Sequence, residues 1–297
     1  MSDDLTRISD ETTVDRVAVP VHDRCQQLAR RWRVSIAESF ETESSLIAYG
    51  QRDTRPVVLK VVKGPGDEWK SGEVVRAFGG RGMVRVYECV DGAALYERLV
   101  PGTELVELSR QGRDEQATAI LADVIGAMSP DIAPTWCPTV SDWGRGFTWY
   151  LRLGDPQIPL VLVARASAMF GELCATQTAT RLLHGDLHHY NVLEDRERGW
   201  VVIDPKGVVG EVAYEIGAAL RNPGELPEVF ANPATIEKRV GVFSARLGLD
   251  ADRVLRWGFA QAVLSAIWQI EDGYMVDATS VPLRLARAID SMLGSRA

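Results

Sequence analysis

The sequence of 297 residues predicts an α+β chain with two lobes, a strand-rich lobe over residues 1–100 and a mostly helical lobe over residues 101–297. Two observations predict this division. Short β-branched runs bounded by turn residues fill the first part, whereas apolar residues at helical spacing dominate the second. A third observation places the boundary, because Pro101-Gly102 interrupts both patterns. Such a joint suits a hinge, and a cleft between two lobes is a frequent ligand site.

The predicted elements of the first lobe are separated by turn residues. Residues 1–15 carry little apolar material, and we expect them to be loose. The run Pro56–Val62 is apolar apart from Lys60, which is typical of a central strand. Around it the sequence predicts a helix over 22–32, strands over 34–40 and 45–50, a helix over 68–78 capped by Asp67, and strands over 83–89 and 93–99 joined by Asp91-Gly92.

The second lobe is predicted to be helical around one polar interruption. Residues 129–157 are rich in Pro, Trp and Gly, which predicts a long irregular connection. Polar residues gather over 184–191, and two short strands are predicted after them, over 191–194 and 200–204. The predicted helices cover 114–128, 160–177, 211–220, 233–247, 253–270 and 281–293.

The charge of the chain is unevenly distributed. The net charge is -8; residues 1–100 hold 15 basic and 16 acidic side chains, and residues 101–297 hold 18 and 25. An acidic second lobe does not attract phosphate, so we expect no nucleic-acid partner. In the simplest interpretation the excess carboxylates keep the surface soluble. In a sharper interpretation some of them line a site for a cationic ligand.

Cysteine usage and the apolar runs indicate the compartment. The four cysteines lie far apart and lack metal-ligand spacing, which is typical of a reducing, cytoplasmic environment. No apolar run reaches the roughly 18–20 residues that span a bilayer, so we expect no membrane partner. The polar start lacks the apolar segment of a secretory signal. These features leave both a monomer and a dimer open.

The most informative stretch is HGDLHHYN at residues 184–191, followed by an apolar strand and then by Asp204 at the end of the next strand. An Asp, an Asn five residues later and a strand-end Asp thirteen residues beyond form a phosphoryl-transfer arrangement. We expect Asp186 to accept or orient the proton of a substrate hydroxyl. Asn191 and Asp204 offer the hard oxygen ligands that Mg²⁺ prefers, next to the phosphates of a nucleotide.

A zinc site is the alternative use of the histidines in this stretch. His184, His188 and His189 are the candidate ligands, and His184 and His188 have the HxxxH spacing of a zinc-binding helix. However, Gly185 and the polar run indicate a loop, and zinc leaves the Asp–Asn–Asp pattern unexplained. We therefore expect His184 to brace the loop, with His188 near the site but outside the chemistry.

At these residues the sequence resembles the aminoglycoside phosphotransferases, the antibiotic-kinase branch of the protein-kinase-like fold. HGDLHHYN matches the loop of that group, in which Gly185 stands where protein kinases have Arg. The strings IDPKGVVGEVAYE, LRNP and QAVLSAIWQIEDG are similar to the streptomycin 6-kinase and hydroxyurea phosphotransferase branch. The resemblance extends from about Val34 to Ile270 and is strongest over 182–223. It implies a bilobal, protein-kinase-like fold that uses ATP with Mg²⁺.

The resemblance also implies roles for residues of the first lobe. A lysine on a central strand should bind the nucleotide phosphates, and we prefer Lys60 to Lys63, which strand alternation places on the opposite face. The partner carboxylate of this lysine should lie on the helix that follows. Glu73 is the best candidate, and Glu68, near the predicted helix start, is the weaker one.

Two further nucleotide contacts follow from the resemblance. The stretch from Glu97 through Leu99 to Val100 should be the hinge that binds adenine through its backbone. The phosphates should be covered by the preceding strand turn, which lacks the glycines of protein kinases. Ser44 and Ser45 are the candidate hydroxyl or backbone N–H donors of that turn.

The candidate acceptor-site residues are one cation close to the transferring phosphate and several carboxylates that suit a cationic substrate: Lys206, Glu211, Glu215, Glu271 and Asp272. Each also has a plainer interpretation. Lys206 and Glu211 suit an exposed ion pair, and Glu211 stands where a helix start favours a carboxylate. Trp268 is expected in the core rather than in the site.

The activity that the resemblance implies is that of a small-molecule kinase, which moves the γ-phosphate of ATP to a hydroxyl of a streptomycin-like aminoglycoside and so inactivates an antibiotic. Hydroxyurea or another small metabolite is the alternative acceptor within the same chemistry. A kinase-like nucleotide-binding module without turnover is the alternative class of protein. The sequence does not separate ATP from GTP.

Overall fold

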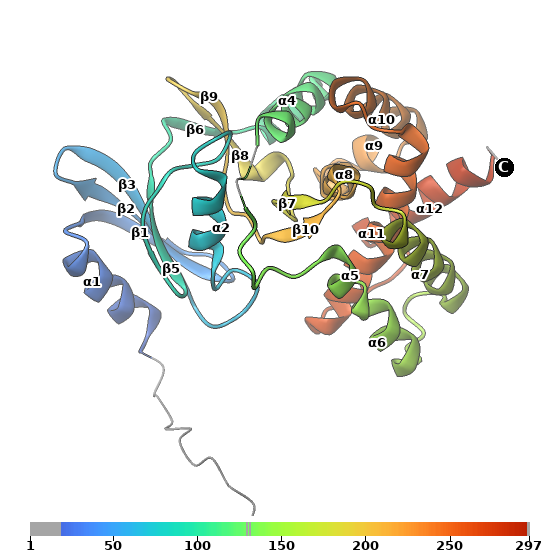
Figure 1. Ribbon diagram of the computed structural model, residues 1–297, viewed down its shortest axis with the longest axis horizontal. Coiled ribbons are helices and arrows are strands. Elements are labelled where there is room, and N and C mark those ends of the chain that lie inside the picture. The colour runs from blue at the N-terminus through green and yellow to red at the C-terminus, as the bar shows by residue number, and fades with distance from the viewer. Residues whose placement is uncertain (1–18, 129, 131, 296–297) are drawn as a thin grey trace, which may run out of the picture.

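A five-stranded antiparallel sheet forms the first lobe of the computed structural model, which describes residues 19–128, 130 and 132–295 (Figure 1). The strand order is β1-β2-β3-β5-β4, so β3 is central, as the sequence predicts. The stretch expected to be loose, residues 1–15, lies outside the described residues. The strands of this sheet are β1 (Ser35–Glu41), β2 (Ser45–Arg52), β3 (Arg55–Val62), β4 (Val86–Val90) and β5 (Ala93–Glu97).

The two faces of β3 have different neighbours, and this places Lys60. The face that begins with Val57 packs against α1 (Val21–Arg31). The face with Val58 packs into the core that contains α2 (Ser71–Phe78) and the second lobe. Figure 1 shows the sheet between α1 and α2. Because side chains alternate along a strand, Lys60 shares the face of Val58 and points toward the second lobe.

Helix α2 begins later than the sequence predicts. Residues 67–70 form turns, and Ser71 is the first helical residue. A backbone hydrogen bond from Ser71 to the carbonyl of Glu68 (3.1 Å) closes these turns. Asp67, the predicted cap, is therefore outside the helix, and Glu68 belongs to a turn.

The second lobe is mostly helical, as the sequence predicts. At its centre α11 packs against α6, α7, α8, α10 and α12 and buries Trp257 and Phe259 completely. In the described ranges no helix is both long and apolar enough to cross a membrane. The helices of this lobe are α3 (Val106–Arg110), α4 (Asp114–Ala127), α5 (Val140–Trp143), α6 (Arg145–Leu153), α7 (Leu160–Ala175), α8 (Val212–Arg221), α9 (Pro227–Phe230), α10 (Pro233–Leu247), α11 (Ala251–Glu271) and α12 (Val281–Gly294).

The irregular connection predicted over 129–157 is partly wrong, because α5 and α6 lie within it. Thr139 and Asp142 form a capping box that starts α5. Helix α6 buries Phe147 and Tyr150, one helical turn apart. The Pro and Gly residues around these two short helices conceal their periodicity in the sequence.

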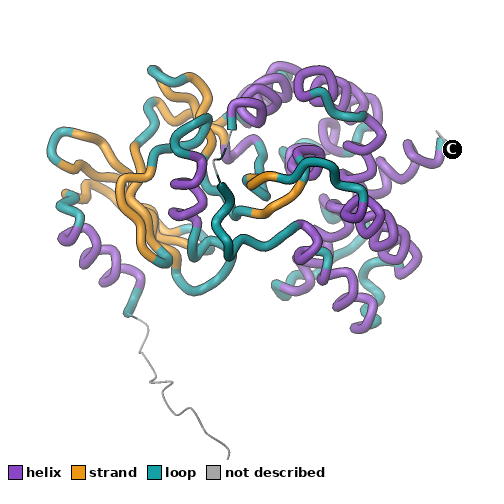
Figure 2. The backbone as a smooth tube through the Cα atoms, viewed as in Figure 1, coloured by secondary structure: helices purple, strands orange, loops and turns teal. Residues whose placement is uncertain are grey.

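Short strands surround the polar stretch at residues 184–191 (Figure 2). The stretch runs between β7 and β8, and Asp204 and Lys206 lie between β9 and β10. The predicted β8–β9 hairpin is confirmed, whereas the short strands β6, β7 and β10 were not predicted. Strand β8 (Val192–Asp195) pairs with β6 (Pro101–Glu104) and β9 (Gly199–Val202), and β7 (Arg181–Leu183) pairs with β10 (Val208–Gly210).

Candidate active site

His184 holds the loop around Asp186 from within. The ring is fully buried; Nδ1 accepts a hydrogen bond from the backbone N–H of Asp186 (3.1 Å), and Nε2 donates to the carbonyl of Ile203 (2.8 Å). Burial lowers the pKa of His184, so the ring is neutral and carries the one N–H that these bonds require. The predicted bracing role of His184 is confirmed. Both ring nitrogens are occupied, which leaves none for zinc.

Glu215 of α8 binds the backbone of the same loop. Its carboxylate accepts hydrogen bonds from the backbone N–H groups of His184 (2.7 Å) and Gly185 (3.0 Å), and only 1% of the residue is exposed. The prediction that Glu215 contacts a substrate is therefore wrong. The sequence shows a carboxylate in the first turn of a helix, but only the packing of α8 against β7 reveals which N–H groups bind it.

Glu211 also has a structural role instead of the predicted contact with a substrate. Its carboxylate accepts hydrogen bonds from Nε of Arg253 (2.6 Å) and from the indole N–H of Trp257. Glu211 is buried, and its ion pair is with Arg253 of α11 rather than with Lys206. Glu211 thus ties the start of α8 to the central helix.

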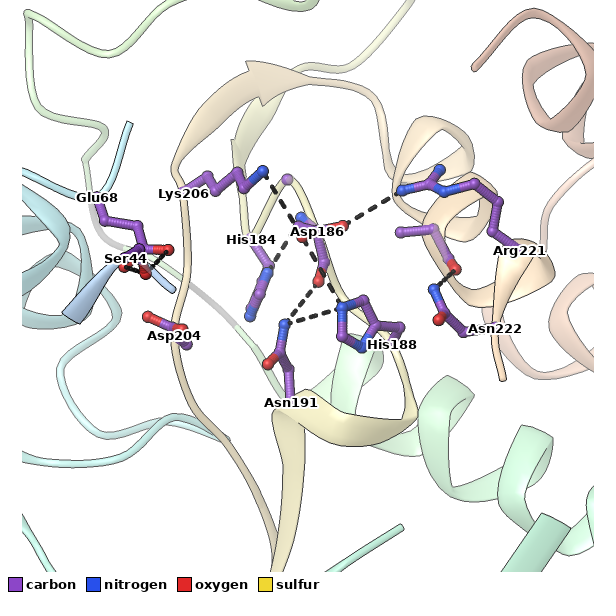
Figure 3. A network of polar contacts seen from close by, with 12 residues as sticks. Ser44, Glu68, His184, Asp186, His188, Asn191, Asp204, Lys206, Arg221 and Asn222 are labelled. Carbon is purple, nitrogen blue, oxygen red and sulfur yellow. Dashed lines mark hydrogen bonds and ion pairs between the residues drawn. The ribbon is translucent and has the colours of Figure 1, made fainter. Parts of the chain in front are cut away.

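Three side chains face the carboxylate of Asp186 (Figure 3). Nη2 of Arg221 donates to Oδ1 (3.3 Å), Nζ of Lys206 lies 3.7 Å from Oδ2, and Nε2 of His188 lies 3.8 Å from Oδ2. Burial by itself raises the pKa of Asp186, but His188, Lys206 and Arg221 outweigh this effect and lower it to about 2. At neutral pH Asp186 is ionised and ready to accept a hydrogen bond from a hydroxyl.

Arg221 is the functional candidate that sequence reasoning missed. It ends α8, and its side chain is 11% exposed. Besides Asp186, its guanidinium binds Oε1 of Gln261 (2.8 Å). The string LRNP contains this arginine, but a basic residue in the last helical turn is expected from the helix dipole alone. No signal in the sequence separates that use from a contact with Asp186.

Asn191 and Asp204 present oxygen atoms next to the loop. Nδ2 of Asn191 donates to the backbone carbonyl of Asp186 (2.9 Å), which leaves Oδ1 as an acceptor on the side toward Asp204 (Figure 3). Asp204 follows β9 with a φ of 61°, and a third of its side chain is exposed. One amide and one carboxylate oxygen fit Mg²⁺, which takes few protein ligands and completes its shell with water and phosphate oxygens.

Lys60 connects the two lobes by ion pairs. Its ammonium lies 2.8 Å from Oε2 of Glu68 and binds the carboxylate of Asp204. Burial by itself lowers the pKa of Lys60, but Asp204 and Glu68 outweigh it and raise this pKa. The lysine therefore keeps its charge in a largely buried position. Lys63 points elsewhere and pairs with Glu41 (2.8 Å).

The predicted partner of Lys60 is wrong, because Glu68 takes the place expected for Glu73. Since α2 starts at Ser71, the turn before it brings Glu68 to the lysine. Glu73 instead accepts a hydrogen bond from the indole N–H of Trp136 (2.8 Å). A late helix start thus decides which of two carboxylates reaches Lys60.

Ser44 and Ser45 lie in the β1–β2 turn, beside the carboxylate that binds Lys60. Oγ of Ser44 lies 3.3 Å from Glu68, and Oγ of Ser45 lies 3.4 Å from it. Both hydroxyls can donate to that carboxylate. The two serines therefore belong to the same polar cluster as the Glu68–Lys60 ion pair.

In the predicted hinge, the side chain of Glu97 is bound within the described chain, whereas the backbone N–H of Leu99 is not. The carboxylate of Glu97 accepts from the backbone N–H of Arg85 (2.8 Å) and binds Arg198, so this side chain is not available to a ligand. Leu99 is buried, and its backbone N–H donates to no other group in the described part of the chain. A backbone N–H without a partner in the described residues, between β5 and β6, suits the edge of an adenine base.

A cavity of about 440 Å³ opens at Asp186, and we call it the Asp186 cavity. Lys206 and Arg221 line it, together with the carboxylates of Asp67, Glu271 and Asp272. Burial, Asp272 and Asp67 raise the pKa of Glu271, so these carboxylates lie close enough to repel one another. Trp268, expected in the core, also lines this cavity and packs edge-on against Trp143 (5.6 Å between ring centroids).

Solved structures share the fold of this chain at low sequence identity. An aminoglycoside phosphotransferase, APH(4)-Ia, in a ternary complex with AMP-PNP and hygromycin B, matches with a TM-score of 0.64 and 19% identity, over 92% of this chain and 99% of that one. The choline kinase LicA from Streptococcus pneumoniae matches with a TM-score of 0.59 and 14% identity, over 92% and 98%. The bilobal, kinase-like fold predicted from the sequence is confirmed.

Sequence comparison identifies the family. Residues 31–273 match the family described as aminoglycoside/hydroxyurea antibiotic resistance kinase. A streptomycin 3''-kinase from Klebsiella pneumoniae is 32% identical over 82% of this chain and 91% of its own length. A hydroxyurea phosphotransferase from Kitasatospora aureofaciens is 30% identical over 80% and 72%. The chain therefore belongs to the aminoglycoside/hydroxyurea antibiotic resistance kinases, a family of phosphotransferases.

Proposed function

We propose that the protein transfers the γ-phosphate of ATP to a hydroxyl of a streptomycin-like aminoglycoside. The observation that carries this proposal is the Asp186 cavity. It contains Asp186, which can accept a hydrogen bond from a substrate hydroxyl, and three further carboxylates. Aminoglycosides combine hydroxyl groups with amino or guanidino cations, so they match both parts of such a cavity. The similarity to a streptomycin 3''-kinase supports the same substrate class.

In this proposal Asp186 directs the reacting hydroxyl. With a pKa of about 2, Asp186 is a weak base. It therefore first orients the hydroxyl by accepting a hydrogen bond from it, and the proton stays on the hydroxyl at that stage. The hydroxyl oxygen forms a bond to the γ-phosphorus while the bond from that phosphorus to the β,γ-bridging oxygen breaks. The proton passes to Asp186 late, and ADP leaves. Positioning and electrostatics supply most of the rate enhancement in such a reaction.

The remaining polar residues divide between the two reactants. Asn191 and Asp204 would hold Mg²⁺, whose charge would offset that of the nucleotide phosphates. Lys60, kept in place by Glu68, is the cation for the phosphates on the other side. Lys206, 3.7 Å from Asp186, is the cation proposed to approach the transferring phosphate. The backbone N–H of Leu99 binds adenine.

Hydroxyurea is the second candidate acceptor, because a hydroxyurea phosphotransferase is 30% identical to this chain. Its hydroxyl suits Asp186 equally well. However, hydroxyurea has only a few heavy atoms and no cationic group at neutral pH. It leaves most of a cavity of about 440 Å³ empty and the carboxylates of Glu271 and Asp272 without a partner.

The test is a panel of acceptors with the purified full-length chain, ATP and Mg²⁺, followed by ADP release and by mass of the product. Streptomycin should gain one phosphoryl group and accelerate ADP release at least a hundredfold over the rate with water as acceptor. Other aminoglycosides, hydroxyurea and simple amino alcohols serve as comparisons. Turnover of hydroxyurea alone would replace the proposed acceptor, and no turnover with any hydroxyl acceptor would support a nucleotide-binding module.

A further inference from the structure

A second cavity, of about 300 Å³, lies next to the Asp186 cavity. We call it the tryptophan cavity, because Trp69, Trp136 and Trp143 line it. Residues 65–70 of the first lobe and 136–143 of the second provide most of its wall. All three tryptophans are half-buried, so each presents part of its ring to the cavity.

The two cavities adjoin. Asp67, Trp143 and Lys206 line both of them. Gly185 lets the ring of Trp143 pack closely against the loop of Asp186, since a Cβ at that position would lie 2.7 Å from this ring. A ligand with its reacting hydroxyl at Asp186 can therefore continue past Trp143 into the tryptophan cavity.

Trp136 is a fixed wall of this second cavity. Its indole N–H donates to Glu73 (2.8 Å), and the ammonium of Lys70 lies over the ring, 5.0 Å from its centroid. Both contacts hold the ring at a set angle before a ligand arrives, which lowers the entropic cost of binding. They also explain what Glu73 does in place of pairing with Lys60.

The two cavities differ in charge and polarity. The Asp186 cavity has four carboxylates and two basic groups, Lys206 and Arg221. The tryptophan cavity has the carboxylate of Asp67 with the ammonium groups of Lys70 and Lys206, so it has no excess of carboxylates. Aromatic and proline rings make up most of the rest. The first cavity suits a cation, and the second suits an uncharged ring with apolar faces.

We propose that the tryptophan cavity binds a second, uncharged sugar ring of the acceptor, linked to the ring whose hydroxyl reaches Asp186. The C–H faces of a sugar ring pack on indole faces, while its hydroxyls reach Asp67 and Lys70. This inference rests on the proposed function and deepens it, since it makes the acceptor an aminoglycoside of at least two rings. Hydroxyurea leaves the tryptophan cavity empty.

The experiment replaces Trp136 in the full-length protein. Trp136→Ala should raise KM for streptomycin about tenfold, as expected for the loss of an aromatic stacking partner. The value of kcat should change less than threefold, and KM for ATP should not change. Trp136→Phe should retain most of the affinity, and Trp136→Leu keeps apolar bulk if the alanine variant folds poorly. Trp149→Ala, at a half-exposed tryptophan of α6 outside both cavities, is the matched control.

Calorimetry with a non-hydrolysable ATP analogue separates the two proposals. Streptomycin should bind Trp136→Ala about tenfold more weakly than the parent, whereas streptidine, the single guanidinium-bearing ring of streptomycin, should bind both equally. Equal binding of streptomycin to parent and variant, or equal weakening of both ligands, overturns the second-ring site. The proposed function fails by a different result, namely absence of streptomycin turnover by the parent.

Discussion

The proposed acceptor side and the proposed nucleotide side of this site are held in different ways. On the acceptor side, buried groups of the second lobe fix the loop: His184 and Glu215 bind its backbone at 2.7–3.1 Å. On the nucleotide side, Glu68 sits in a turn, and Ser44 and Ser45 approach it only at 3.3–3.4 Å. The first arrangement consists of short hydrogen bonds to the backbone of one loop, whereas the second joins two turns by longer side-chain contacts. We therefore expect substitutions on the acceptor side to reduce phosphotransfer more than substitutions on the nucleotide side.

The largest effect is expected on the acceptor side, at Asp186. Asp186→Asn keeps the shape of the side chain but removes its charge and its ability to take a proton. Phosphotransfer should fall by about a thousandfold or more, within the range that acid–base catalysis contributes. Affinity for ATP, measured by calorimetry, should stay within about twofold. Phosphotransfer at the parental rate would remove Asp186 from its proposed role.

An intermediate effect is expected at Arg221, together with a change in pH dependence. Arg221→Gln removes a cation that lowers the pKa of Asp186, so that pKa should rise. Asp186 is then protonated at a higher pH than in the parent. In the pH profile of kcat/KM, the acid limb should therefore shift to higher pH. At pH 7.5 we expect kcat to fall about tenfold to a hundredfold, as for a buried charge that loses its partner.

The control for Arg221 is another arginine of the second lobe with a carboxylate partner. Arg256→Gln breaks the pair with Glu172, an exposed residue on α7. This substitution should leave the pH profile unchanged and cost at most about 1 kcal/mol of unfolding free energy. Identical pH profiles for Arg221→Gln and the parent would mean that Arg221 does not influence Asp186.

The smallest effect is expected on the nucleotide side, where two glutamates provide a matched pair. Glu68→Gln removes one of the two carboxylate charges that pair with Lys60 and should raise KM for ATP about threefold to tenfold. Glu73→Gln leaves the Lys60 pair intact and should leave KM for ATP unchanged, because Glu73 binds Trp136. Steady-state kinetics at saturating acceptor decides between them. The reverse result would restore Glu73 as the partner of Lys60.

Local patterns in the sequence determined much of this protein. The apolar run around Lys60 predicted the central strand, and helical spacing predicted most of the second lobe. The strings over 182–223 predicted the loop with Asp186 and the family. These features depend on residues close together in the chain, where periodicity and turn chemistry act directly.

The tertiary structure alone decided where isolated charged side chains go. Glu211 and Glu215 look in the sequence like surface carboxylates at a helix start, yet both are buried, because Arg253 and the backbone of the 184–191 loop come to them from elsewhere in the chain. Likewise, Arg221 reaches Asp186 only because α8 packs beneath that loop. A charged group takes the partner that the fold brings within a few ångströms, and sequence spacing does not encode that distance.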